Sequence, residues 1–194
     1  RNGRQLALSA SYDAMLEAQA HAGKASPVEQ AMIRALPARY PQREAIEDMT
    51  PWDKAYTKEM RKVFGAFPED LEVRAVFAES IMNETPWQMW DLPSGKPAEG
   101  AGTEECRKVL EYAFDKLPAA WDHPGLLHLY VHLMEMSPFP QRALRAGDRL
   151  REIVPDSGHL IHMPTHLDVL CGHYNDVLVH NQKALATDRR FLAY

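Results

Sequence analysis

Histidine is the residue type in this chain whose number and spacing point most directly to chemistry. Six of the nine histidines lie between positions 123 and 166. A neutral imidazole ring binds zinc, copper or iron, whereas magnesium and calcium prefer oxygen ligands. The clustering therefore predicts a transition-metal site built from imidazoles. The candidate ligands are His123, His128, His132, His159, His162 and His166.

Two pairs of these histidines have a spacing that brings side chains to one face of a helix. His128 and His132 are four residues apart, and so are His162 and His166. Residues at this spacing have Cβ atoms about 5–6 Å from each other. We predict that the two pairs together form the primary ligand cluster, with copper, iron or zinc as the bound metal.

The remaining two candidates lie near expected helix ends. His159 precedes the second pair by three residues, and His123 stands directly before Pro124, where it could cap a helix or add a ligand. Pro164 has no N–H, so the helix that carries the second pair should begin or bend there. Three histidines from each group could also make two tri-histidine sets, as a pair of copper ions would require.

Glu135 lies one turn beyond His132 on the same predicted helical face, and we predict that it is the catalytic residue. It could be a ligand, an acceptor that orients a histidine ring, or a general base. The zinc peptidase motif is excluded because Leu129, rather than Glu, follows His128. A carboxylate-bridged di-iron site needs additional carboxylates at helical spacing, and Glu135 is the one well-placed candidate.

The elements that must position these residues are helices, because apolar residues recur at helical spacing and no segment alternates as a strand does. We expect an all-α protein of stacked helical hairpins, forming one domain over residues 1–194. A proline-rich loop over residues 86–102 interrupts the series. Helices are predicted over residues 10–22, 26–38, from 50, from 68, and over 103–117, 124–136, 140–154, 160–171 and 174–187.

The C-terminal part contains an internal repeat. A shift of 34 residues aligns His128 with His162 and also His132 with His166. This is the period of the tetratricopeptide repeat, in which each unit is a pair of helices. Residues 123–191 therefore divide into two candidate repeat units that carry the histidines.

Particular residues strengthen this similarity. Gly172 and Tyr174 stand where the repeat has its Gly-x-Tyr turn, Ala184 matches its small packing position, and Pro155 matches its terminal proline. Departures are Pro138 and Pro140 at the turn of the first copy and Arg189 at the expected final proline.

The segments HPGLLHLYVHLMEMSP, PDSGHLIHMPTH and AESIMNETPWQMW resemble a subgroup of bacterial and fungal tetratricopeptide-like proteins. The resemblance implies an α-solenoid in which the first helix of each pair lines a concave groove. Neighbouring helices pack with axes about 8–10 Å apart, so the two histidine pairs would face the same groove. The resemblance implies no particular reaction.

Composition excludes other classes of function. The net charge of −5 and the absence of a long Lys or Arg block argue against nucleic acid as a partner. No apolar stretch approaches the roughly 18 residues of a membrane span, so we expect no membrane partner. Two cysteines make no disulfide framework, which favours a reducing, cytoplasmic location. Because the chain opens at Arg1 rather than Met, we expect a processed chain or a fragment of a longer protein.

Two functions from different classes follow from the pattern. The first is a metalloenzyme, an oxidoreductase in preference to a hydrolase, that acts on a small molecule at the groove-facing histidines. The second is a non-catalytic tetratricopeptide module that holds a protein or peptide partner in the groove. A metal carrier or sensor is a third possibility.

Overall fold

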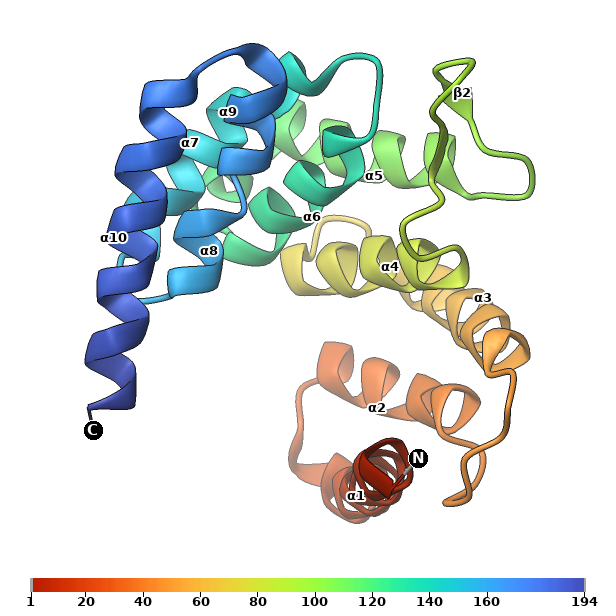
Figure 1. Ribbon diagram of the computed structural model, residues 1–194. Helices are drawn as coiled ribbons and strands as arrows, with labels where there is room; N and C mark the ends of the chain where they lie inside the picture. Colours follow the sequence, from red (N-terminus) through yellow and green to blue (C-terminus); the bar gives the residue numbers. More distant parts are fainter. Residues whose placement is uncertain (1, 194) are drawn as a thin grey trace. The chain divides into compact units, whose positions relative to one another are not determined.

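The computed structural model describes residues 2–193, which are helical over most of their length (Figure 1). The predicted all-α class is confirmed. Contacts divide the chain into two compact units, Arg1–Glu84 and Thr85–Tyr194, and each is described separately here. The single domain expected from the sequence stays a prediction.

The first unit contains four α-helices and one short 3₁₀ helix. Its elements are α1 (Asn2–His21), η1 (Ala22–Lys24), α2 (Pro27–Arg39), α3 (Thr50–Ala66) and α4 (Leu71–Glu84). Consecutive helices pack on each other, α1 on α2, α2 on α3 and α3 on α4. At the start of α2 the Ser26 hydroxyl accepts from the Glu29 N–H, and the Glu29 carboxylate accepts from the Ser26 N–H. This reciprocal cap fixes where α2 begins.

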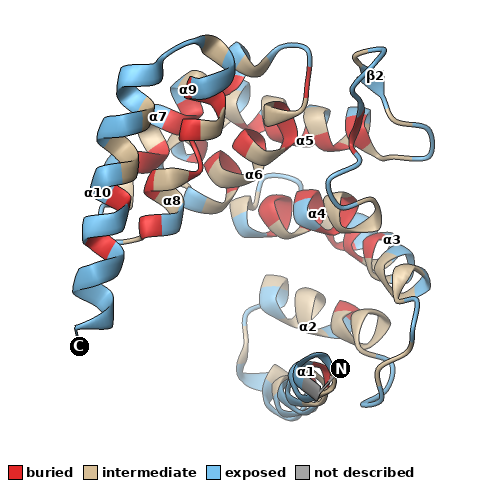
Figure 2. Ribbon diagram, viewed as in Figure 1, coloured by how far each residue is buried: buried red, intermediate tan, exposed pale blue. Residues whose placement is uncertain are grey.

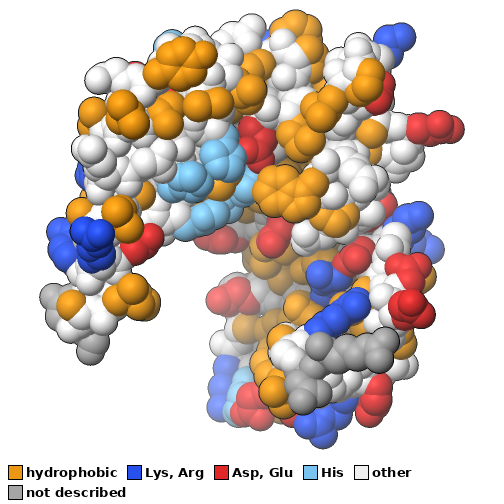
Figure 3. All heavy atoms as spheres, viewed as in Figure 1, with side chains coloured by type: hydrophobic (Ala, Val, Ile, Leu, Met, Phe, Trp, Pro, Cys, Tyr) orange, Lys and Arg blue, Asp and Glu red, His pale blue; other side chains and the backbone are white. Residues whose placement is uncertain are grey.

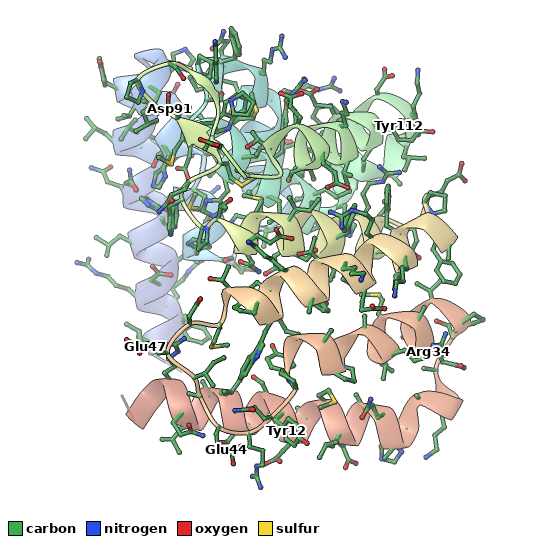
Figure 4. The ribbon with its side chains drawn as sticks, turned by 90° about the vertical axis from the view of Figure 1, so that its right-hand side faces the viewer. Tyr12, Arg34, Glu44, Glu47, Asp91 and Tyr112 are labelled. Atoms are coloured by element: carbon green, nitrogen blue, oxygen red, sulfur yellow. The ribbon has the colours of Figure 1, made fainter. Side chains whose placement is uncertain are left out.

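The connection between α2 and α3 is fastened to α1. Gln5 donates to the Arg43 carbonyl at 2.8 Å and accepts from the Ala45 N–H at 2.8 Å. Arg43 also pairs with Asp13 at 2.6 Å. Figure 4 shows this segment, with Glu44 labelled, running beside α1. Side-chain hydrogen bonds thus replace the backbone pairing that a loop lacks.

The second unit carries every candidate metal ligand. Its helices are α5 (Thr103–Lys116), η2 (Pro118–Asp122), α6 (Pro124–Glu135), η3 (Pro140–Ala143), α7 (Leu144–Ile153), α8 (Gly158–His162), α9 (Thr165–Cys171) and α10 (Tyr174–Leu192). Within the proline-rich loop, β1 (Trp90–Asp91) and β2 (Lys96–Pro97) form a short antiparallel ladder, with Trp90 opposite Pro97. No strand was predicted there from the sequence, because two-residue strands are too short to show an alternating pattern.

Helix α6 lies at the centre of this unit. It contacts α5, α7 and α9, while α10 contacts α8 and α9. Leu126, Leu133, Leu150, Ile161 and Leu167 are completely buried between these helices. Figure 2 shows buried residues concentrated on α5 to α9 and exposed residues along much of α10. The apolar core therefore fixes α6 against α9, and these two helices carry three of the six candidate ligands, His128, His132 and His166.

The helix predicted over residues 160–171 is two helices, α8 and α9. The break falls at Met163 and Pro164, where proline has no N–H to donate. The Thr165 hydroxyl donates to the His162 carbonyl, and the His166 N–H donates to the Met163 carbonyl. These bonds close the turn. The sequence expectation of a start or bend near Pro164 is thus correct, whereas the single helix is not.

Tetratricopeptide-like solenoid stacking stays a prediction, since an all-helical architecture alone does not establish it. Among the described residues, no helix combines the length and the apolar character needed to cross a bilayer.

A buried ion pair joins α7 to α9. Arg151 donates to the Asp168 carboxylate at 3.0 Å, and their side chains are 7% and 3% exposed. Asp148, which is 66% exposed, lies 3.8 Å from the same guanidinium. Removing one member of a buried pair leaves an uncompensated charge, whereas an exposed pair contributes little.

We therefore expect Asp168→Ala to lower the free energy of unfolding by about 3–5 kcal/mol. The matched control Asp148→Ala should lower it by less than about 1 kcal/mol. Urea unfolding at pH 7, followed by circular dichroism, measures both. Equal losses for the two variants would contradict the assignment of Asp168 as the principal partner of Arg151.

Candidate metal centre

Three short elements of the second unit position the histidines. Helix α6 carries His128 and His132, α8 carries His159 and His162, and α9 carries His166. The packing of α6 on α9, and the short turn between α8 and α9, bring these elements together. Figure 3 shows histidine side chains gathered into one patch on the surface.

The tightest grouping is a triad of His128, His132 and His159. One ring nitrogen from each lies within 4.8 Å of the other two. The Nε2 atoms of His128 and His159 are 3.1 Å apart, and the ring centroids of His128 and His132 are 4.5 Å apart. The first two side chains are half-buried and the third is exposed. This is the one group of three or more such ligands in the part of the chain that the structure describes.

Glu135 connects the triad to the other histidines. Its Oε1 lies 3.0 Å from Nδ1 of His132, and its Oε2 is hydrogen-bonded to Nδ1 of His166. The carboxylate side chain is 8% exposed. His166 in turn faces His162, with the two Nε2 atoms 3.1 Å apart. The histidines thus form one chain of contacts with the carboxylate in the middle.

The charge on Glu135 is stabilised by these neighbours. Burial acts to raise the pKa of the carboxyl group, but the hydrogen bonds from His132 and His166 outweigh it and lower the pKa to about 2. The hydrogen bond to Glu135 correspondingly raises the pKa of His166. An ionised carboxylate only accepts hydrogen bonds, so Nδ1 of each histidine is the donor.

Two histidines of the triad, His128 and His159, are held neutral. Burial, together with the neighbouring imidazoles of His132 and His159, lowers the pKa of His128 to about 4. Burial also lowers the pKa of His159, with a smaller contribution from nearby histidines. At neutral pH these rings keep a lone pair, which is the form that binds metal.

Asn181 of α10 orients the ring of His162. Its amide nitrogen donates to the Val177 carbonyl at 2.9 Å and to the Thr165 hydroxyl at 3.3 Å. This fixes the amide so that Oδ1 accepts from Nδ1 of His162 at 2.6 Å. Asn181 could not be predicted from the sequence, because a polar residue in a helix 19 positions from His162 gives no periodic signal.

Of the six predicted ligands, His123 lies apart from the cluster. Its Nδ1 accepts from the Leu126 N–H at 3.2 Å, so it caps α6. This is one of the two roles that the sequence left open for it. The two predicted pairs, His128 with His132 and His162 with His166, are connected through Glu135. The compact triad also includes His159, which was predicted as an additional ligand outside the two pairs.

Trp87 borders the triad. Its ring meets that of His132 edge to face, with centroids 5.5 Å apart, and the residue is 65% exposed. Its φ of +62° lies in a region that bulky residues rarely adopt. Strained backbone of this kind is found preferentially at functional sites.

Comparison with known protein families, curated proteins and solved structures found no match to this chain. The tetratricopeptide resemblance therefore stays a prediction.

The Glu135 carboxylate should stabilise the metal-free fold in a defined pH range. Its pKa is lowered from 4.5 to about 2, so its contribution is present above pH 4.5 and lost as pH falls toward 2. The raised pKa of His166 has the opposite effect on the pH dependence. Its contribution to the stability of the fold is lost as pH rises through the pKa of His166 in the folded state.

We expect Glu135→Gln to lower the free energy of unfolding by roughly 2–3 kcal/mol at pH 5.5, and by less than half of that at pH 3. Urea unfolding with a chelator present measures the difference. The control is Glu152→Gln, because the Glu152 side chain is 65% exposed. A loss that is the same at both pH values would contradict the ionic role of Glu135.

Proposed function

We propose that this chain is a metalloenzyme that holds a transition metal ion through His128, His132 and His159 and acts on a small molecule. The observation that carries the proposal is the convergence of three ring nitrogens within 4.8 Å. Two ligands of one tetrahedral ion, each about 2.0–2.1 Å from it, are roughly 3.3 Å apart. The 3.1 Å between His128 and His159 is close to that value.

The number and type of the ligands support a catalytic rather than a structural site. Three protein ligands leave a coordination position open to a substrate, whereas structural zinc sites have four. Imidazole suits copper, iron and zinc. When bound, such a metal would either transfer electrons or polarise an atom of the substrate.

Redox chemistry is favoured over hydrolysis by the state of Glu135. A general base works best with a pKa near the operating pH, and the pKa of Glu135 is about 2. Both of its oxygens also accept hydrogen bonds from histidine rings. Of the roles that the sequence left open for Glu135, that of a positioning residue is therefore the one we propose.

A cavity beside the histidines supports a small-molecule substrate. It has a volume of about 450 Å³ and is lined by Glu135, Met136, His162, Thr165, His166, Val169, Leu170, Val177 and Asn181. A substrate held there would meet both apolar side chains, such as Val169 and Leu170, and the imidazoles of His162 and His166.

The alternative function is a non-catalytic tetratricopeptide interaction module. The observation that favours it is a row of exposed apolar side chains on α10, in which Tyr174, Leu178 and Leu185 are 67%, 65% and 52% exposed. Residues at this spacing share one face of a helix, which could pack against a peptide or partner helix.

The proposal predicts metal in protein that is purified without a histidine tag and without added metal. Elemental analysis should find at least one equivalent of copper or iron per chain. The double variant His128→Ala/His159→Ala should lose about one equivalent, because two of three ligands are removed. The control is His21→Ala on α1, whose side chain is 56% exposed and pairs with Glu17.

The outcomes separate the alternatives. Zinc alone, in stoichiometric amount, would contradict the redox assignment but keep the metal site. Metal-free protein that takes up none on titration would contradict the metalloenzyme and favour the interaction module. Equal metal content in the double variant and in His21→Ala would place the metal elsewhere.

A further inference from the structure

His162 and His166 face each other through Nε2 atoms that are 3.1 Å apart. The proton positions on the two rings follow from their other contacts. Nδ1 of His162 donates to the Asn181 Oδ1, whose amide is fixed by its own two donor bonds. Nδ1 of His166 donates to the Glu135 carboxylate, which can only accept.

When both rings are neutral, each has its one proton on Nδ1, so both Nε2 atoms present a lone pair. Two lone pairs at 3.1 Å repel each other unless a cation lies between them. Glu135 raises the pKa of His166, so in the metal-free chain that cation is a proton taken up by His166, and a metal ion that binds both rings displaces it. The Asn181 amide and the Glu135 carboxylate thus hold two metal-binding atoms facing each other, with no protein donor assigned between them. This is the same arrangement of outer acceptors that orients histidine ligands in metal sites.

We propose that His162 and His166 bind a second transition metal ion, which makes the centre dinuclear with Glu135 between its two halves. The inference rests on the proposed function, because the first ion is the one assigned to His128, His132 and His159. The second ion is of the same chemical class, a copper, iron or zinc ion that accepts imidazole nitrogen.

The distance between the nitrogens fits one shared ion. With metal–nitrogen bonds of about 2.0–2.1 Å, a separation of 3.1 Å corresponds to an angle of roughly 100° at the metal. This lies between the square-planar and the tetrahedral values. No side chain has to change rotamer for the two rings to share the ion.

The second site is less enclosed by protein ligands than the first. Two histidines leave at least two coordination positions to water or substrate. Two cavities adjoin them, the one of about 450 Å³ described above and another of about 390 Å³ that includes His159 and Asp188. His162 and Asn181 line both cavities. The second ion is therefore the weaker one and the one that a small molecule would reach directly.

Glu135 gives the proposal a distinctive signature. It holds Nδ1 of His132 on the side of the first ion and Nδ1 of His166 on the side of the second. Asn181 holds only His162. Loss of an outer acceptor typically weakens metal affinity 10–100-fold. Glu135→Gln should therefore lower the affinity for both ions, whereas Asn181→Leu should lower the affinity for the second ion alone.

The test is equilibrium dialysis of the metal-free chain against Cu²⁺, with free glycine as a competitor that suppresses weak surface binding. We expect two equivalents for the wild-type chain and one each for His162→Ala/His166→Ala and His128→Ala/His159→Ala. Dialysis over a range of Cu²⁺ concentrations then gives the affinity of each equivalent in Asn181→Leu and Glu135→Gln. Circular dichroism confirms that each variant is folded.

The failure of this inference differs from the failure of the proposed function. One equivalent in the wild-type chain, unchanged in His162→Ala/His166→Ala, would overturn the second site and leave the first. One equivalent that is lost in His162→Ala/His166→Ala and kept in His128→Ala/His159→Ala would support the second site and overturn the first. No binding by the wild-type chain would overturn both, and a shared proton between the two rings would then be the cation.

Discussion

The arrangement of the candidate centre depends on one buried carboxylate. Glu135 ends α6 and accepts hydrogen bonds from His132 on its own helix and from His166 on α9. Because its pKa is about 2, it stays an acceptor at any physiological pH. Both rings therefore turn their Nε2 atoms away from it, one toward the triad and the other toward His162. A single negative charge thereby fixes the direction of imidazoles on two helices.

The sequence predicted the class of fold, and it singled out the histidines that lie together better than the residues that hold their rings. Helical periodicity and prolines located most helices, but the first two turns of α1, a weakly amphipathic helix, were missed. Pro164 indicated a break, yet the pattern could not tell a bend from two helices. The outer acceptors depend on tertiary packing, so no local signal revealed that Asn181 would meet His162.

The residues that the 34-residue shift aligns in the sequence are not the residues that touch each other in the structure. A shift of 34 residues aligns His128 with His162, but His128 touches His159, and Glu135 touches His166, each 31 residues further along the chain. Both contacts have the same offset, three residues shorter than the repeat. Three residues of helix rise about 4.5 Å, close to one turn. The contacts between α6 and the α8–α9 segment thus run at an offset of 31 residues, which places His159 rather than His162 against His128.

The electrostatics of the cluster make it better suited to metal than to a peptide. Burial and neighbouring rings lower the pKa of His128 to about 4, so the folded state resists protonation that the unfolded chain accepts near pH 6.5. The lowered pKa of His128 therefore makes the fold less stable as pH falls, and a groove that binds a peptide would gain nothing from this cost. A metal site does benefit, because imidazole nitrogens that stay unprotonated at neutral pH have lone pairs available to bind the ion. The negative charge of Glu135 also favours a bound cation, since it opposes the positive charge that ligation brings into a partly buried site.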